Sequence, residues 1–324
     1  MKNNTMTDWD VKKAFSKYSN FNGYFPLIYI DDYWNYYIDS FGLKESYENF
    51  RELFKKEFKG FGEFRNTMTE TIKNTSRKLF NTNRSEALII LQDSINHIDP
   101  LNGKYDQIIY TPDGKYLQVD LHKAFDTVLK KIAIFNNNYE STTDIIKDVT
   151  KSELIPTLKW PRILSYVGAL SQQLSNCFLN CKDLLNKIYK SDHQIIQMLN
   201  QKYELTTVGG DMYLYNIGDD DLTNLVGDYE IDGIPFSISL YELKTVNILG
   251  QKNKLKICTS SNKIDYVIGY TDKGHILPEL FPLAISLYKG KEPNEKDLAI
   301  GYEDKIYFYL NENDNRLGYK EELR

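Results

Sequence analysis

Asp120 is the residue whose type and position are best suited to chemistry. It follows the stretch Tyr116–Val119, which predicts a buried strand, and a stretch with helical spacing comes directly after it. A carboxylate at the carboxyl end of a strand, just before a helix, is a common way to place a metal ligand at the rim of a sheet. We therefore expect Asp120 to lie at such a rim.

A second acidic residue, Asp211, occurs within a predicted hairpin. The segment ELTTVGGDMYLYN is typical of a strand, a tight turn and a second strand, and Gly209 and Gly210 allow the sharp turn. The next acidic run, residues 219–221, predicts the solvated end of the second strand. The hairpin thus carries one acidic residue near its tip.

Other chemistries find little support in the sequence. The four histidines lack the spacing of a zinc site, and no phosphate-binding loop, dinucleotide-binding turn or GxSxG elbow occurs. The three cysteines do not form a disulfide framework, and Cys177 and Cys181, one helical turn apart, predict small core residues in a reducing compartment.

Composition limits the class of protein. The chain has 324 residues, enough for two or three packed parts, and a formal net charge of −5 with a pI near 5.6. This balance argues against indiscriminate binding of polyanions, so nucleic acid would have to meet a local basic face. We find no apolar run of membrane-spanning length and no apolar signal core at the start, and we expect a cytoplasmic protein without a membrane partner.

Residues 1–98 predict a helical N-terminal region. Asp31 and Asp32 favour a helix cap before YWNYYIDSF over the end of a short strand, and a later helix is expected to begin at the cap Ser85. A loose basic cluster lies around the joint between two of these helices. The favoured interpretation of this cluster is a solvated helix face, and the alternative is a surface that binds a triphosphate or a template backbone. The members of the cluster are Lys73, Arg77, Lys78 and Arg84.

The remaining chain alternates helices with strands. Pro112-Asp113-Gly114 predicts a turn that leads into the strand before Asp120, and one long helix is expected from Arg162 onward. From Val226 the chain is rich in strands, with a short helix at LFPLAISLYKG. The last segment, NENDNRLGYKEELR, is polar and predicts a frayed end.

Three segments, in the same order, resemble the motifs of palm-domain nucleic acid polymerases. DLHKAFDTV is similar to the first palm motif of reverse transcriptases and, more loosely, to that of family B DNA polymerases. YVGALSQQLSN is similar to the second motif, and the hairpin with Asp211 is similar to the third. The Gln-Gly pair of reverse transcriptases is missing, Gly168 falls one residue late for family B, and Gly210 or Met212 replaces an expected aspartate. Taken alone, Gly168 also fits a helix that packs closely through small residues.

The resemblance implies a fold and a site. The fold is α+β, with a fingers-like helical region (1–98), a palm-like domain with an antiparallel sheet and flanking helices (99–250) and a β-rich C-terminal region (251–324). Two divalent ions, Mg²⁺ or Mn²⁺, would be held by Asp120, Asp211 and the carbonyl of Leu121. Phe125 would lie beneath the sugar and disfavour a ribonucleotide. The other residues implied to bind substrate are Lys123, Lys159, Arg162, Tyr166 and Gly168, and Lys244 is carried over from the segment after the third motif.

Three functional interpretations follow. The first is a template-dependent nucleotidyltransferase, acting on a primer–template with nucleoside triphosphates, from a divergent phage or virus. The alternative is a palm-derived subunit without catalysis that binds nucleic acid or other replication or transcription proteins of a phage complex; the reduced acidic count at the hairpin and the acidic net charge favour it. In the third, the motifs are coincidental in an α+β interaction protein.

Overall fold

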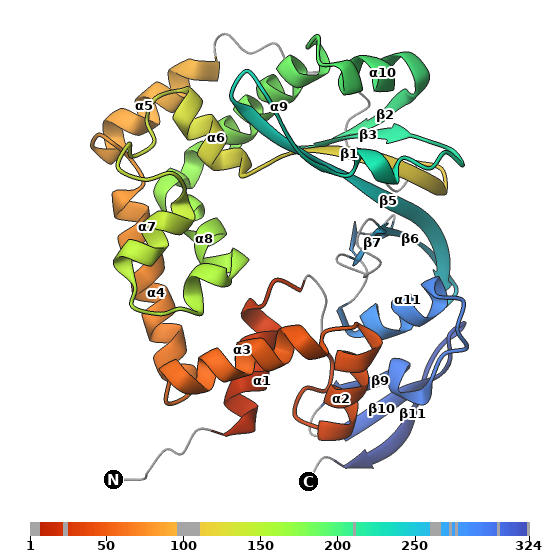
Figure 1. Cartoon of the computed structure of the whole chain (residues 1–324). Coiled ribbons are helices and arrows are strands. Elements are labelled where there is room, and N and C mark those ends of the chain that lie inside the picture. Colours follow the sequence, from red (N-terminus) through yellow and green to blue (C-terminus); the bar gives the residue numbers. More distant parts are fainter. Residues whose placement is uncertain are drawn as a thin grey trace. The chain divides into compact units, whose positions relative to one another are not determined.

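The computed structural model (Figure 1) describes residues 7–21, 25–95, 111–209, 212–259, 267–271, 274–275, 278–302 and 305–322. The chain divides into two compact units. The first unit consists of Met1–Lys56, Ile108–Lys115 and Tyr241–Arg324, and the second consists of Glu57–Gln107 and Tyr116–Leu240. The three-part division expected from the sequence stays a prediction.

The second unit contains a sheet whose connections cross over. Strand β1 (Gly114–Leu121) pairs antiparallel with β3 (Met212–Asn216), which pairs antiparallel with β2 (Glu204–Val208). Strand β5 (Ile234–Ile248), of which the residues up to Leu240 belong to this unit, is the neighbour of β1 on its other side and also pairs with β4 (Gly227–Ile231). Because β1 and β2 are both antiparallel to β3, they run in the same direction with β3 between them. This is a split βαβ arrangement.

Helices fill the connection from β1 to β2 and precede β1. The helices of the second unit are α4 (Phe61–Lys78), α5 (Arg84–Ser94), α6 (Ala124–Lys131), α7 (Thr142–Val149), α8 (Lys159–Leu170), α9 (Leu174–Tyr189) and α10 (Gln194–Lys202). Helix α5 is capped by Asn83, whose side chain accepts a bond from the backbone N–H of Glu86, so the expected cap at Ser85 was wrong by two residues. Asparagine and serine are about equally favoured at the cap position, so the sequence alone does not distinguish Asn83 from Ser85.

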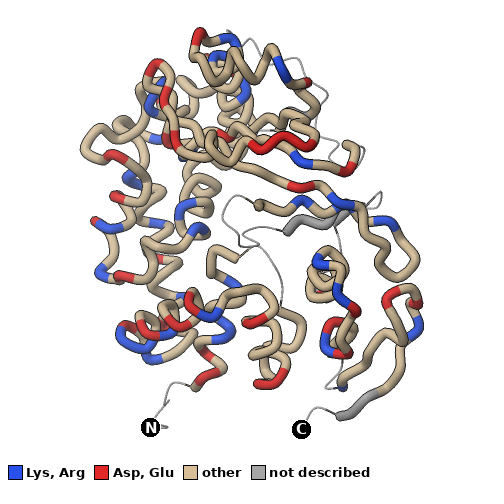
Figure 2. The backbone as a smooth tube through the Cα atoms, turned by 45° about the vertical axis from the view of Figure 1, so that its right-hand side comes forward, with Lys and Arg blue, Asp and Glu red and all other residues tan. Residues whose placement is uncertain are grey.

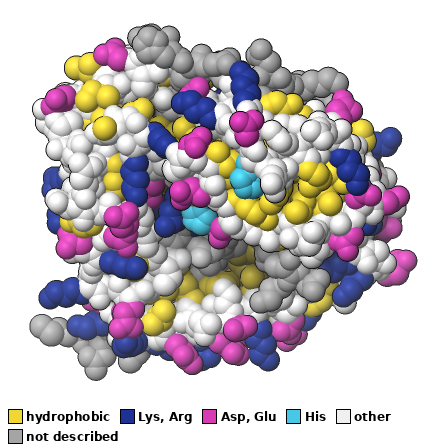
Figure 3. All heavy atoms as spheres, turned by 45° about the horizontal axis from the view of Figure 1, so that its top comes forward, with side chains coloured by type: hydrophobic (Ala, Val, Ile, Leu, Met, Phe, Trp, Pro, Cys, Tyr) yellow, Lys and Arg dark blue, Asp and Glu magenta, His cyan; other side chains and the backbone are white. Residues whose placement is uncertain are grey.

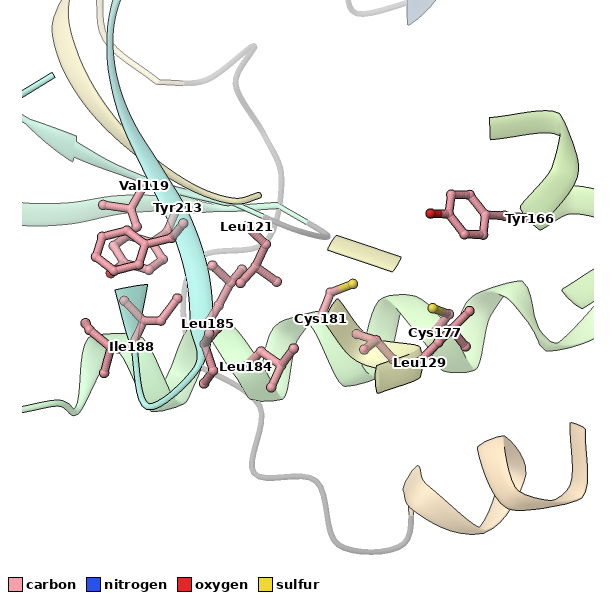
Figure 4. Close-up of a cluster of buried hydrophobic side chains, with 14 of the residues drawn as sticks. Val119, Leu121, Leu129, Tyr166, Cys177, Cys181, Leu184, Leu185, Ile188 and Tyr213 are labelled. Carbon is pink, nitrogen blue, oxygen red and sulfur yellow. The ribbon is translucent and has the colours of Figure 1, made fainter. Parts of the chain in front are cut away.

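The core of the second unit lies between one face of the sheet and the helices. Side chains alternate along a strand, so Leu117, Val119 and Leu121 of β1 share a face, and all three are buried. They pack with residues of α6 and α9, as Figure 4 shows for Leu184, Leu185 and their neighbours. Each fully buried aliphatic side chain contributes roughly 1.5–3 kcal/mol. The opposite face of β1 carries Tyr116, Gln118 and Asp120.

The single long helix expected from Arg162 is interrupted. Helix α8 ends at Leu170, a 3₁₀ turn covers Ser171–Gln173, and α9 begins at Leu174. Ser171 has φ 48° and ψ −120°, a conformation that costs a residue with a Cβ about 1–3 kcal/mol. Arg84 stabilises the break by donating to the carbonyl of Ala169 (2.7 Å) and to the hydroxyl of Ser171 (2.6 Å).

The first unit has an aromatic helical part. Phe15 and Trp34 are fully buried and their rings meet edge to face at 6.1 Å. The helices are α1 (Asp8–Tyr18), α2 (Asp31–Ser40) and α3 (Lys44–Glu57). Asp31 and Asp32 stand in the first turn of α2 behind the cap position Ile30, so the helix was predicted correctly but its cap was not.

The first unit also contains most of the C-terminal strands. Strand β6 (Gln251–Cys258) pairs with β5, β7 (Val267–Thr271) with β6, and β8 (Gly274–His275) with β7. A separate three-stranded antiparallel sheet has the order β11–β10–β9. Its strands are β9 (Ala299–Tyr302), β10 (Lys305–Asn311) and β11 (Asp314–Glu322). Helix α11 (Phe281–Tyr288) precedes this sheet in the sequence. Residues 314–322 of the last segment form a strand in this sheet, so the fraying expected from polarity was wrong over that range.

The α+β fold class is confirmed: a helical N-terminal region is followed by an antiparallel sheet with helices and by a small three-stranded sheet. The strands after Val226 and the short helix at 281–288 also agree with the prediction. None of the helices in the described ranges has both the length and the apolar character needed to cross a bilayer.

Candidate active site

Asp120 lies next to the end of β1, as expected. It pairs with Met212 of β3 in the antiparallel register, and its side chain is half-buried. Gln118, two residues earlier on the same face, donates from Nε2 to Asp120 Oδ2 at 3.3 Å. The carboxylate therefore stands at the rim of the sheet, on the face opposite to the one that packs on α6 and α9.

Asp211 lies outside the described residues, but the hairpin that carries it is defined on both sides. Strands β2 and β3 pair antiparallel, and the N–H of Gly209 donates to the carbonyl of Met212 at 2.7 Å. A Cβ at Gly209 would lie 3.1 Å from Met212 Cγ, so a larger residue there would require the Met212 side chain to shift. The register places Met212, the residue that follows Asp211 in the sequence, opposite Asp120.

A left-handed residue joins β1 to α6. Lys123 has φ 49° and ψ 47° at the cap position of α6, and its carbonyl accepts from the N–H of Thr127 at 3.0 Å. Its side chain is exposed and makes no ion pair with any residue that the structure describes. Leu121 ends β1 with its side chain in the core, and its carbonyl as a metal ligand stays a prediction.

Phe125 lies in the first turn of α6 between two other aromatic rings. Its ring meets those of Tyr166 on α8 and Phe178 on α9 edge to face, both at 5.0 Å between centroids. Such pairs fix ring orientation and are worth about 0.5–1.5 kcal/mol beyond burial. Two residues predicted as substrate contacts, Phe125 and Tyr166, are thus brought together by ring packing.

Tyr166 is held by a buried carboxylate that the sequence reasoning missed. Its hydroxyl donates to Asp126 Oδ1 at 2.6 Å, and Asp126, 2% exposed, also accepts from the N–H (3.2 Å) and the hydroxyl (2.6 Å) of Thr142. Burial first, and then the charge of Asp126, raise the pKa of Tyr166 well above its ordinary value, so the hydroxyl stays protonated. An aspartate in a first helical turn resembles a solvated helix-start residue in sequence, and no local signal marks it as buried.

The other predicted contacts on α8 differ in their surroundings. Gly168 packs against α4, where a Cβ would come within 2.9 Å of Ser76 Oγ, so its small size serves helix packing. Arg162 is half-buried and near enough to Tyr166 for its charge to lower the pKa of that hydroxyl slightly against the larger raising effects. Lys159 is exposed at the start of α8.

The four basic residues expected around the helix joint have different partners. Lys78 pairs with Asp148 at 2.7 Å and Arg84 is used at the break after α8, whereas Lys73 and Arg77 are exposed on α4. Figure 2 shows basic and acidic residues interspersed along the described chain. Lys244 of the first unit donates to the carbonyl of Tyr288 at 3.0 Å, which gives it a structural partner.

A cavity of about 580 Å³ opens beside the start of α6. Two pairs of its ionisable groups lie close together: His122 Nδ1 is 3.5 Å from Asp228 Oδ1, and Lys130 Nζ is 3.3 Å from Glu140 Oε2. The face in Figure 3 shows the same intermingling of basic and acidic side chains. The full lining is His122, Lys123, Asp126, Thr127, Lys130, Lys131, Glu140, Asp228, Glu230, Gly233 and Pro235.

Within the described ranges, no three His, Cys, Asp or Glu side chains converge as a metal site would require. A site at Asp120 would need a further carboxylate, for which Asp211 is the sequence candidate. Comparison of the chain with protein-family models, with curated proteins and with solved structures finds no match.

Proposed function

We propose that this chain is a template-dependent nucleotidyltransferase of the palm type, similar to reverse transcriptases or family B DNA polymerases. The observation that carries the proposal is the pairing of Asp120 with Met212 across β1 and β3. It brings the first and third palm-like segments onto neighbouring strands of a split βαβ sheet. Two segments that are far apart in the sequence thereby gain a common geometric context.

The donor chemistry fits a divalent cation. Carboxylate oxygens are the ligands that Mg²⁺ prefers, and Mg²⁺ keeps several waters, so two aspartates and a substrate triphosphate suffice. When bound, such ions activate the primer hydroxyl and stabilise the leaving pyrophosphate. Asp120, half-buried at the end of β1, supplies one of these ligands in our proposal, and Asp211 supplies the other.

The chain's other residues would bind and orient the nucleotide. Lys123 presents an exposed ammonium group directly after β1, where it can contact a phosphate. Phe125 has a ring whose orientation is fixed by Tyr166 and Phe178, as a residue that discriminates between sugars requires. Because the substrates are nucleic acid and nucleoside triphosphates, we propose a cytoplasmic location and a role beside other replication or transcription proteins.

One observation favours the alternative of a palm-derived binding subunit without catalysis. Tyr166 and Gly168, which the resemblance would set beside the nucleotide, are used for a buried hydrogen bond and for helix packing. Such a subunit would bind a primer–template or a protein partner without extending a chain.

Extension of a labelled primer tests the proposal. The full chain is incubated with DNA and RNA templates, all nucleotides and Mg²⁺ or Mn²⁺, alongside Asp120→Asn and Asp211→Asn. We expect each variant to lose at least 100-fold in rate. The matched control Asp219→Asn removes an exposed aspartate near the end of β3 and should extend like wild type.

The outcomes separate the two functions. If wild type is inactive on every template but shifts the mobility of the primer–template, the binding subunit is the better account. If wild type extends and Asp120→Asn extends equally well, the activity belongs to a different site and the proposed ligand is wrong.

A further inference from the structure

The ring of Phe125 contacts two helices that meet at the break around Ser171. Tyr166 belongs to α8 and Phe178 to α9, and the centroid of each ring is 5.0 Å from that of Phe125. Two separations of 5.0 Å place the rings of Tyr166 and Phe178 no more than 10 Å apart. Phe125 is thus held from both sides of the break.

An unbroken helix would not allow both contacts. Tyr166 and Phe178 are 12 positions apart, so in one straight helix their Cα atoms would be separated by about 18 Å along the axis. The Cα–Cβ bonds of a helix all tilt toward its N-terminus, so the two rings would keep a similar separation. The change of direction at Ser171 is therefore a condition for the packing of Phe125.

Arg84 stabilises this change of direction. In an unbroken helix the carbonyl of Ala169 would accept from the N–H four residues later; at the break, Arg84 Nε donates to this carbonyl at 2.7 Å. Nη2 of the same guanidinium donates at 2.6 Å to the hydroxyl of Ser171, whose backbone is strained by its positive φ. Bonds from a charged donor are stronger than those between neutral groups. They oppose the helical spacing of the segment, which favours a continuous helix.

We propose that Arg84 is a positioning residue, which holds the angle between α8 and α9 and, through that angle, the ring of Phe125. Tyr166 fixes the α8 side, since its hydroxyl is bonded to the buried Asp126. Phe178 then reaches Phe125 only while α9 leaves the break in its present direction. A consequence for nucleotide selection rests on the proposed function, in which Phe125 lies beneath the sugar, but the geometric role of Arg84 does not.

The distance between the far ends of α8 and α9 tests the geometric role. Spin labels are attached through Lys159→Cys and Lys187→Cys, both at exposed positions, and pulsed electron paramagnetic resonance measures their separation. The three native cysteines are buried, so the label goes to the introduced ones. Arg84→Met removes both donors, and we expect the distance to lengthen toward that of one straight helix, about 42 Å. The control Arg65→Met, at an exposed position of α4, should keep the wild-type distance.

A substitution at Ser171 separates loss of the angle from a general loss of stability. Glycine adopts a positive φ without strain, so Arg84→Met/Ser171→Gly should return the distance toward the wild-type value. If Arg84→Met keeps the wild-type distance, Arg84 does not hold the angle and the inference is overturned. Should Arg84→Met not fold, Arg84→Lys is measured instead, because an ammonium group does not replace the planar fork that reaches both acceptors.

Primer extension by the unlabelled chain measures the consequence for nucleotide selection. In Arg84→Met the ratio of kcat/KM for deoxynucleotides to that for ribonucleotides should fall about tenfold. Arg84→Met/Phe125→Leu should fall no further than Phe125→Leu alone, because Arg84 acts through the ring. If wild type does not extend a primer, the proposed function fails, whereas the measured distance still decides the role of Arg84. If the distance lengthens and the ratio stays constant, Arg84 holds the ring but the ring does not select the sugar.

Discussion

The hydroxyl of Tyr166 donates a 2.6 Å hydrogen bond to the buried carboxylate of Asp126, although the two residues are 40 positions apart. Because Thr142 also donates to Asp126, one carboxylate connects α6, α7 and α8. A hydrogen bond to a buried charged group is worth more than a neutral one at the surface. This carboxylate therefore fixes the helices that surround Phe125.

Tyr166→Phe should lower the free energy of unfolding by about 2 kcal/mol, because the buried carboxylate of Asp126 loses a donor. The control is Tyr139→Phe, which removes a 2.7 Å bond from a tyrosine to the exposed Asp148 and should have no measurable effect. Urea unfolding of both variants checks the prediction. If Tyr166→Phe and Tyr139→Phe unfold with equal free energies, the burial of Asp126 does not strengthen its hydrogen bond with Tyr166.

Asp113→Asn should destabilise the first unit in a pH-dependent way. Burial alone would raise the pKa of Asp113, but hydrogen bonds from Lys254 and Thr245 outweigh it and hold the pKa below its ordinary value of 3.8. A lowered pKa contributes stability above pH 3.8, which is lost as the pH falls through the folded value. At pH 7 we expect a loss of about 1 kcal/mol, because Lys254 is buried but solvent screens its attraction to the half-exposed Asp113.

The measurement for Asp113→Asn is urea unfolding from pH 7 down to pH 3. The gap between wild type and variant should begin to narrow below pH 3.8, where Asp113 of the unfolded chain becomes protonated, and should close as the pH falls through the lower pKa of the folded protein. A gap that stays constant over this range would mean that the ion pair with Lys254 does not cause the loss. In the background Lys254→Met, Asp113→Asn should have a smaller effect at pH 7.

Ser171→Gly should be more stable than Ser171→Ala by about 1–2 kcal/mol. Both variants lose the hydroxyl that accepts from Arg84, but only alanine keeps a Cβ at φ 48°. The order reverses the usual preference for alanine over glycine next to helices. The unfolding temperatures of the two variants test this prediction. If Ser171→Ala is the more stable variant, the backbone at the break between α8 and α9 is not strained.

Gly168→Ala should destabilise the second unit by about 1–3 kcal/mol, because the new Cβ would meet Ser76 Oγ at 2.9 Å. Gly62→Ala is the matched control in α4, where a Cβ meets nothing within 4 Å, and it should stabilise by about 0.5–1 kcal/mol. Both are measured by urea unfolding. Ser76→Ala should restore part of the loss, since it removes the clashing hydroxyl.

The elements that the sequence predicted well are those with strong local patterns. The strand before Asp120, the hairpin around residues 204–216 and the helix at 281–288 each carry periodic apolar residues and clear turn signals. The rim position of Asp120 follows from such a pattern, because a strand that runs directly into a helix places its last residues at an edge. Local chemistry decides these features.

Features that depend on distant partners were not predicted. The break at Ser171 is stabilised by Arg84, which lies 87 residues earlier in the sequence. The helical spacing of the segment around Ser171 therefore did not predict the break. Strand β11 is polar along much of its length and is ordered by pairing with β10. The burial of Asp126 depends on two other helices, and so does the hydrogen bond that it accepts from Tyr166.

The division of the chain into two units sets an order for folding during synthesis. The second unit has all its residues once Leu240 has been added, whereas the first unit also needs Tyr241–Arg324. Met1–Lys56 is synthesised before the C-terminal strands and the helix with which it shares a unit, so it remains without them until they have been made. Domains fold as units as the chain emerges, so the aromatic surface of α1 and α2 is exposed longest to chaperones and to aggregation.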